Sequence, residues 1–255
     1  MTSDQTGTAP IPASANGDRP LRPVVAGIIV AAGRGTRYGA PDKVLLPLAG
    51  RPLLGWVLAA FDNSLVREIV VVVGGHTRAM VESLVEDLCL ATPVRMVGGG
   101  ERRQDSVAFG VKAVGADIDL VAIHDAARPL ISAALIDRTI ERAVVTGAAI
   151  AASPVTDTLK RVGDDFAIRE TVPRDGLWAA QTPQVFNREL LARVSEGAFF
   201  RDTMFTDEAA LFEALGHSVS IVPNHEPNPK VTHPGDLRTI AALLDTPDDA
   251  RERHP

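Results

Sequence analysis

Cysteine and long apolar runs are scarce in this 255-residue chain. Cys89 is its only cysteine, so no disulfide can form within the chain, and a disulfide-rich secreted fold is excluded. No apolar run approaches the roughly 18 to 20 residues that a membrane helix needs, and the N-terminus lacks the basic and apolar regions of a signal peptide. We therefore expect a cytoplasmic protein with no membrane partner.

Positive charge is not in excess either. The chain has 26 lysines and arginines against 32 acidic residues, which gives a formal net charge of −6. Proteins that bind nucleic acid normally show a basic excess, so no nucleic-acid partner is expected. If the substrates are anionic, the cations that bind them must be concentrated in one place.

The hydrophobic pattern divides the chain into one domain and two tails. Residues 1–23 are rich in Thr, Ser, Pro, Gly and Ala and lack periodicity, and residues 246–255 are similar, so both are expected to be disordered. Residues 24–245 are long enough for one main hydrophobic core.

Short apolar strands alternate with helical patterns in this domain. Strands are expected at Val24–Val30, Glu68–Val73, Val94–Val97, Leu120–Ile123, Ala148–Pro154 and Ser218–Val222. Helices are expected near Leu53–Asp62, Thr77–Leu88, Arg103–Val114, Ser132–Val145, Arg188–Ser195, Asp207–Leu215 and Pro234–Leu244. This alternation predicts an α/β fold with a mostly parallel sheet and helices on both faces, which binds ligands at the carboxyl ends of its strands.

The alternation is interrupted after Pro154. The segments Asp157–Val162 and Ala167–Val172 are short, polar and β-branched, and Gly163-Asp164-Asp165 between them is typical of a turn. We expect a β-arm over about residues 155–175 that leaves the main sheet. Such an arm has little apolar area of its own, so it is expected to pack on another subunit and form a homodimer.

A glycine-rich loop follows the first strand, with the sequence Ala31-Ala32-Gly33-Arg34-Gly35-Thr36-Arg37. Glycine lets the backbone approach a phosphate closely, Arg37 offers two donors, and Lys43 adds a point charge. The loop matches neither the Walker pattern nor the dinucleotide fingerprint. A plain turn between strand and helix is the alternative, but the two cations together favour a nucleotide whose pyrophosphate leaves.

A second motif, His124-Asp125-Ala126-Ala127-Arg128-Pro129, follows the strand at Leu120–Ile123. Asp125 should emerge at the same sheet edge as the glycine loop. One carboxylate there can hold Mg²⁺ that bridges phosphate oxygens, with Arg128 beside it, although a surface Asp–Arg pair is the simpler alternative. His124 is expected to be a structural hydrogen-bonding residue.

Two further segments are weak signals by themselves and are interpreted only together with these motifs. The run from Gly98 to Ser106 ends a strand and opens a helix, so its backbone and Ser106 could contact a nucleobase, but a plain loop would look the same. Lys230 follows Pro229 ahead of a helix, where a lone lysine is usually solvated.

No strong general base is evident. The other histidines show no metal-ligand spacing, and Cys89 has no partner for nucleophilic work. A phosphate monoester is already ionised near neutral pH, so its attack on a nucleotide α-phosphate needs no such base. Positioning and charge neutralisation by Arg, Lys, Asp and Mg²⁺ would suffice.

Taken in order, these segments resemble the 2-C-methyl-D-erythritol 4-phosphate cytidylyltransferases of the non-mevalonate isoprenoid pathway. The similarity extends from about Val24 to Leu244 and rests on AAGRGTR, GGGERRQDSV, HDAARP, PVTDTLKR, TVPRDGLWAAQTPQVF, TDEAAL and PKVTHPGDL. The resemblance implies a homodimeric transferase on a Rossmann-like sheet, which converts CTP and methylerythritol phosphate into the cytidine diphosphate product and pyrophosphate.

The resemblance also implies roles for individual residues. CTP would be bound by Ala31, Ala32, Gly33, Gly35, Thr36, Gly100, Glu101, Ser106, Ala126 and Arg128. The polyol phosphate would be bound by Thr158, Thr182, Thr206 and Asp207. Asp125 would bind Mg²⁺. Arg37 and Lys43 match the transition-state stabilisers, whereas Arg174, delivered across the dimer, and Lys230 would orient the attacking phosphate.

Two positions depart from the family pattern. The family usually has the lysine directly after the proline, whereas Asp42 stands between Pro41 and Lys43 here. An acidic neighbour repels a triphosphate unless it turns outward or meets the metal. Pro229 stands where a longer residue is more common, and it stiffens the loop before Lys230.

Two other functions fit the same motifs. Ribitol-5-phosphate cytidylyltransferases share most of them, because their acceptor also presents a phosphate on a short polyol. A non-catalytic nucleotide-sensing domain would keep the fold, but it would not need Arg37, Lys43, Asp125 and Lys230 together.

Overall fold

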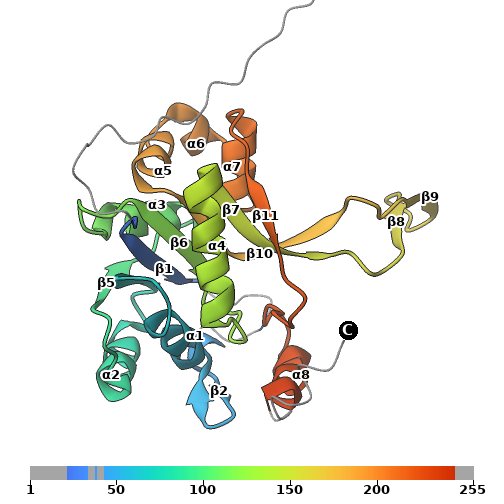
Figure 1. The fold of residues 1–255 in the computed structure, drawn as a ribbon. Coiled ribbons are helices and arrows are strands. Elements are labelled where there is room, and N and C mark those ends of the chain that lie inside the picture. The colour runs from blue at the N-terminus through green and yellow to red at the C-terminus, as the bar shows by residue number, and fades with distance from the viewer. Residues whose placement is uncertain (1–21, 34–37, 39–42, 245–255) are drawn as a thin grey trace, which may run out of the picture.

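A seven-stranded sheet forms the centre of the protein in the computed structural model, which describes residues 22–33, 38 and 43–244 (Figure 1). Its strand order is β11-β7-β10-β6-β1-β4-β5. The strands are β1 (Val25–Ala31), β4 (Glu68–Val73), β5 (Val94–Gly98), β6 (Leu120–Asp125), β7 (Ala148–Pro154), β10 (Trp178–Asn187) and β11 (Ser220–Pro223). Apart from Arg22 and Pro23, the expected tails at residues 1–23 and 246–255 lie outside the described residues.

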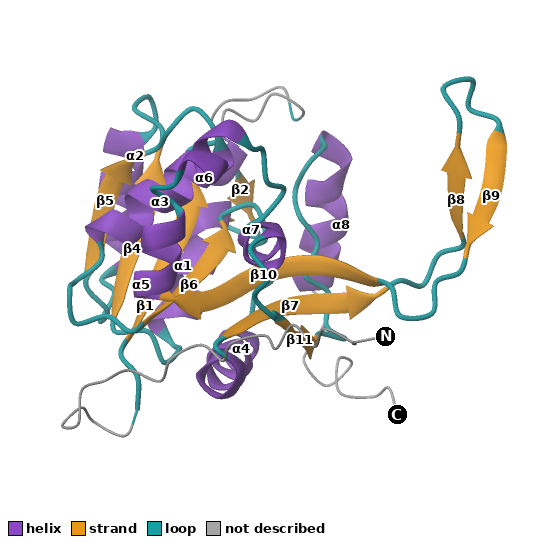
Figure 2. Cartoon of the chain, turned by 90° about the horizontal axis from the view of Figure 1, so that it is seen from above, coloured by secondary structure: helices purple, strands orange, loops and turns teal. Residues whose placement is uncertain are grey.

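Helices cover both faces of this sheet, as the alternation of strands and helices predicted (Figure 2). One face packs against α1 (Leu53–Asp62), α2 (Arg78–Leu88) and α4 (Ala133–Thr146). The other face packs against α3 (Arg103–Ala113), α5 (Arg188–Val194), α6 (Ala198–Asp202) and α7 (Glu208–Ala214). Alternate residues of a strand point to opposite faces of the sheet, and nearly every residue of β1 and β4 is buried. Both faces of these strands are therefore covered, which explains why their sequences are continuous apolar runs.

Strand β10 is a strand of the central sheet that the sequence did not predict. It lies between β6 and β7 and runs antiparallel to both, whereas the neighbouring pairs β1–β6, β1–β4, β4–β5 and β7–β11 are parallel. The first residues of β10 are exposed, and the pairing with β7 shifts register between Ala180 and Gln184. Polar residues at this irregularity interrupt the apolar pattern that marks the other strands.

A two-stranded arm projects from the main body, as expected (Figure 2). It consists of β8 (Leu159–Val162) paired antiparallel with β9 (Ile168–Val172). Phe166 is 87% exposed and Ile168 is 63% exposed, so apolar side chains lie uncovered on the arm in a single chain.

A small third cluster lies beside the carboxyl edge of the sheet. It joins Leu48 of the short hairpin formed by β2 (Pro47–Leu48) and β3 (Arg51–Pro52) to α8 (Pro234–Leu244). Leu48, Val231 and Ile240 are buried together there. The 3-10 helix η1 (Lys43–Leu45) precedes this hairpin and packs its Val44 into the core that α1, α2 and α4 share with the sheet. The sequence predicted α8 but neither η1 nor the hairpin. None of the helices in the described part of the chain is long and apolar enough to span a membrane.

Candidate functional site

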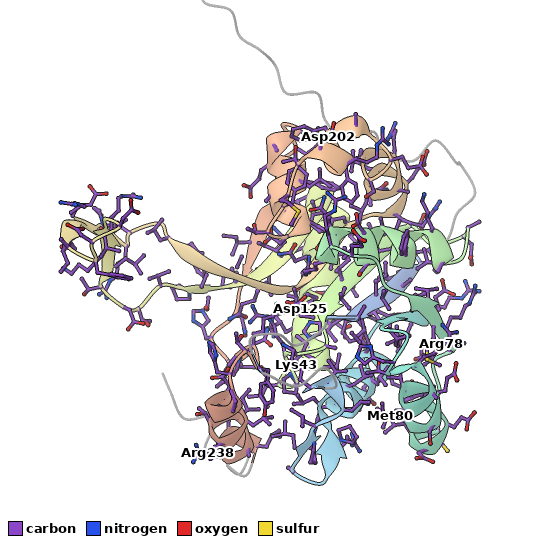
Figure 3. All side chains as sticks on the ribbon, turned by 180° about the vertical axis from the view of Figure 1, so that it is seen from behind. Lys43, Arg78, Met80, Asp125, Asp202 and Arg238 are labelled. Carbon is purple, nitrogen blue, oxygen red and sulfur yellow. The ribbon has the colours of Figure 1, made fainter. Side chains whose placement is uncertain are left out.

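A cavity of about 350 Å³ opens at the sheet edge where β1, β5 and β6 end. Parallel strands bring their carboxyl ends to one edge, so loops that are far apart in sequence meet there. Of the residues predicted from the sequence, the cavity is lined by Ala31, Ala32, Gly33, Lys43, Gly100, Glu101, Ser106, Asp125 and Lys230. Figure 3 shows Lys43 and Asp125 together in this region. The predicted residues Gly35, Thr36 and Arg37 lie outside the described residues.

One wall of the cavity is made by the loops after β1 and β5, which touch each other. A Cβ added at Gly99 would lie 2.2 Å from the Cβ of Ala32, so only glycine fits there. The Gly100 N–H donates to Oγ of Ser106 at 3.0 Å, and this hydroxyl donates to the Arg102 carbonyl at 3.2 Å. Ser106 is therefore engaged in holding the shape of the wall.

Asp125 ends β6 and lies between two cations. Its Oδ1 is 3.1 Å from Nε of Arg103, and its Oδ2 is 2.6 Å from Nζ of Lys230. Burial alone would raise the pKa of this carboxyl, but the charges of Arg103 and Lys230 outweigh it and hold the pKa well below its usual range. The site thus contains an ionised carboxylate at neutral pH.

Arg103 is a cavity residue that the sequence reasoning did not single out. Its Nη1 lies 2.8 and 2.9 Å from the two carboxylate oxygens of Glu208, whose side chain is only 4% exposed. Burial raises the pKa of Glu208, and it would lower that of Arg103, but Glu208 and Asp125 together raise the pKa of the guanidinium. Its position in the sequence could have identified it, because Arg103 is the first residue of a helix that closely follows Gly98, Gly99 and Gly100.

The loop before α8 carries Lys230 and also binds Lys43, which begins η1. The Val231 N–H donates to the Ala127 carbonyl at 2.8 Å, which fixes Lys230 beside the end of β6. The ammonium of Lys43 donates to the Val231 carbonyl at 3.0 Å. Asp42 lies outside the described residues, but the structure places Lys43 in the cavity.

His124 forms a hydrogen-bonded chain beneath Asp125. The Asp125 N–H donates to Oγ1 of Thr182 at 3.2 Å, and this hydroxyl lies 2.9 Å from Nδ1 of His124. Nε2 of His124 lies 3.1 Å from the Arg128 carbonyl, which can only accept, so Nε2 carries the hydrogen and Nδ1 accepts from Thr182. Burial lowers the pKa of His124 to about 4, so the ring is neutral and orients the strand end.

Arg128 and Ala126 follow Asp125 in the chain but lie outside the cavity lining. Nη1 of Arg128 donates to the Asn228 carbonyl at 2.7 Å, just before the loop that carries Lys230. Burial lowers the pKa of Arg128. Neither Arg128 nor the buried Ala126 lines the cavity, so their predicted contact with the nucleotide stays a prediction.

The residues predicted to bind the acceptor do not line the cavity of a single chain. Thr158 and Arg174 are exposed on segments that flank the projecting arm, and Arg174 donates to the Thr156 carbonyl. Thr206 is exposed, whereas Asp207 caps α7, with Oδ1 accepting from the Ala210 N–H and Oδ2 from Nε2 of Gln184, both at 2.9 Å. Thr182 lies under Asp125. Their role in acceptor binding stays a prediction.

The carboxylates of the cavity limit how a metal could be held. Among the described residues, no group of three or more His, Cys, Asp or Glu side chains could enclose an ion. Mg²⁺ is commonly bound by one or two carboxylates together with the phosphates of a substrate. Asp125 therefore fits a metal that shares its ligands with a nucleotide.

Comparison with known proteins agrees with this geometry. The family profile of 2-C-methyl-D-erythritol 4-phosphate cytidylyltransferase matches residues 25–246. The protein of that name from Synechococcus elongatus is 44% identical over 219 residues, which cover 85% of this chain and 94% of the relative. The one from Gloeobacter violaceus is 41% identical over 222 residues, covering 86% of this chain and 95% of the relative.

Solved structures give the same result. The crystal structure of 4-diphosphocytidyl-2C-methyl-D-erythritol synthase from Anaerococcus prevotii is 28% identical, with a TM-score of 0.77 over 88% of this chain and 99% of that chain. The 2-C-methyl-D-erythritol 4-phosphate cytidylyltransferase of Thermus thermophilus is 32% identical, with a TM-score of 0.70 over 86% of this chain and 98% of that chain. The chain therefore belongs to the 2-C-methyl-D-erythritol 4-phosphate cytidylyltransferase family.

Proposed function

We propose that this protein transfers a cytidylyl group from CTP to 2-C-methyl-D-erythritol 4-phosphate and releases pyrophosphate, in the non-mevalonate synthesis of isoprenoid precursors. The observation that carries the proposal is the ionised Asp125 between Arg103 and Lys230, in a cavity whose wall is the glycine-rich loop. Membership of the family supports the choice of substrates.

The reaction needs charge and alignment more than it needs a base. An oxygen of the acceptor phosphate attacks the α-phosphorus of CTP, a new P–O bond forms, and the bond to pyrophosphate breaks with its electron pair on the leaving group. Lys43 and Arg37 stabilise the charge that develops, and Lys230 and Arg174 align the attacking phosphate. His124 takes no part in proton transfer, because both of its nitrogens are engaged in the chain beneath Asp125.

Asp125 is the residue that would hold Mg²⁺. Bound there, the ion would neutralise negative charge on the nucleotide phosphates. Both carboxylate oxygens now face cations of the protein, so binding would exchange at least one of these contacts. Lys230, which is the more exposed of the two cations, is then available to the acceptor phosphate.

The working form of the enzyme is a cytoplasmic homodimer. The exposed apolar side chains of the arm, above all Phe166 and Ile168, need a cover that a single chain does not give them. A partner subunit that covers the arm would also let Arg174 and Thr158 enter the neighbouring site, which explains why neither lines the cavity of its own chain. The single cysteine fits a reducing compartment.

An acceptor assay tests this function. Purified protein is incubated with CTP, Mg²⁺ and either methylerythritol phosphate or ribitol 5-phosphate, and product and pyrophosphate are followed by ³¹P NMR. We expect turnover with methylerythritol phosphate. Turnover with ribitol phosphate alone would assign the protein to the other acceptor, and CTP binding without release of pyrophosphate would make it a sensor.

A further inference from the structure

Two arginines open α3 and line the cavity, but they are held very differently. Arg102 is neutralised by Asp105, with three contacts of 2.6 to 3.1 Å between its guanidinium and that carboxylate. Its remaining nitrogen, Nη1, donates to the Arg201 carbonyl at 2.8 Å. The donors of Arg102 are therefore used within the protein.

Arg103 uses only two of its three guanidinium nitrogens in contacts with the described residues. Nη1 is held by both oxygens of Glu208, and Nε contacts Oδ1 of Asp125. Its other terminal nitrogen, Nη2, has no hydrogen-bond partner among the described residues. Arg103 lines the cavity, so a guanidinium with two nitrogens bound by the protein and one left unbonded is suited to receive an anion there.

Glu208 fixes the orientation of the Arg103 guanidinium by binding Nη1 with both carboxylate oxygens. It is buried, begins α7 and holds Nη1 of Arg103 at 2.8 Å. Without it, the planar fork of Arg103 could turn and bind both oxygens of Asp125, a geometry that arginine and carboxylate favour. That turn would use the free donor and also block the carboxylate expected to hold Mg²⁺.

We propose that Glu208 is a positioning residue that holds Arg103 so that the guanidinium contacts a phosphate of the bound nucleotide. The inference rests on the proposed function, because CTP supplies the phosphate. It adds two residues to the site. Arg103 touches the substrate, and Glu208 acts only through Arg103.

The test compares nucleotide binding in Arg103→Gln, Glu208→Gln and the double variant. The dissociation constants of CTP and of cytidine, which has no phosphate, are measured for each protein at one fixed Mg²⁺ concentration, by calorimetry and NMR titration. Arg103→Gln should weaken CTP on the order of 10- to 100-fold, the usual value of a hydrogen bond to a charged group, and leave cytidine within about 2-fold. Glu208→Gln should weaken CTP by at least about 3-fold, and the double variant should resemble Arg103→Gln alone, because the two residues act as one unit.

Glu68→Gln is the matched control. Glu68 is also a buried glutamate, with its side chain 10% exposed and 2.9 Å from Nη2 of Arg95, but it begins β4 at the sheet edge opposite the cavity. Both glutamate variants should lose thermal stability, whereas only Glu208→Gln should lose affinity for CTP. If Glu208→Gln does not fold, Glu208→Asp replaces it, since it keeps the charge but is too short to hold Nη1 with both oxygens.

Several results would overturn the inference. Unchanged CTP affinity in Arg103→Gln would show that Arg103 does not contact the phosphate. An equal loss of affinity for CTP and cytidine would show a general effect on the pocket. Additive losses of CTP affinity in the double variant, or unchanged CTP affinity in Glu208→Gln, would show that Glu208 does not position Arg103. A wild-type protein that does not bind CTP overturns the proposed function and this inference with it, so the two failures are told apart.

Discussion

Lys43 offers the sharpest test of the cation cluster, because Asp42 made its place uncertain from the sequence. The ammonium is anchored 3.0 Å from the Val231 carbonyl, in the same cavity as Asp125. A charge about 4 Å from a phosphate oxygen contributes roughly 4 kcal/mol at an effective dielectric constant of about 20. If this stabilisation is gained mainly in the transition state, Lys43→Met should reduce kcat on the order of 10²- to 10³-fold.

The assay measures kcat and CTP affinity separately. Lys43→Met keeps most of the aliphatic stem, so CTP should bind within about 10-fold of wild type while kcat falls. Lys112→Met serves as the control, because Lys112 is an exposed lysine on α3 that pairs with Glu196 and does not line the cavity. Wild-type turnover in Lys43→Met would refute the reasoning and would mean that Lys43 does not face the reacting phosphate.

Two further predictions follow from the buried strand end and from the arm. Because burial lowers the pKa of His124 from 6.5 to about 4, the unfolded chain takes up a proton in this pH range that the native protein does not, so His124 should remove roughly 3 kcal/mol of unfolding free energy between pH 7 and pH 4. Urea unfolding without added metal should therefore show a weaker pH dependence for His124→Gln than for wild type, and equal dependences would contradict a neutral buried ring. If Arg174 acts across the dimer, inactive Arg174→Ala and inactive Asp125→Ala subunits should regain activity when mixed. Activity that stays absent despite subunit exchange, followed by mass spectrometry, would place Arg174 in the site of its own chain.

Local patterns were enough to predict most of the fold. Buried parallel strands read as apolar runs, and their helices show their own periodicity, so β1, β4, β6 and α4 all lie close to where the sequence placed them. Strand β10 was missed because its first three residues, where the chain returns from the arm, are exposed and polar residues follow them. Its place between β6 and β7 depends on pairing with residues far away in the chain, which no local pattern encodes.

The sequence alone determined that a glycine-rich loop and Asp125 follow strands whose ends lie at one edge of the sheet, because strand ends are marked locally and parallel strands share one edge. Only the tertiary structure decided what Asp125 meets there. Lys230 is 105 residues away from it along the chain, and Glu208 is 105 residues from Arg103, which it holds. Such pairs form because the packing of α7, and of the loop before α8, on the sheet brings distant charges together in a buried space. There, unlike charges attract more strongly than in water, and unpaired charges are costly.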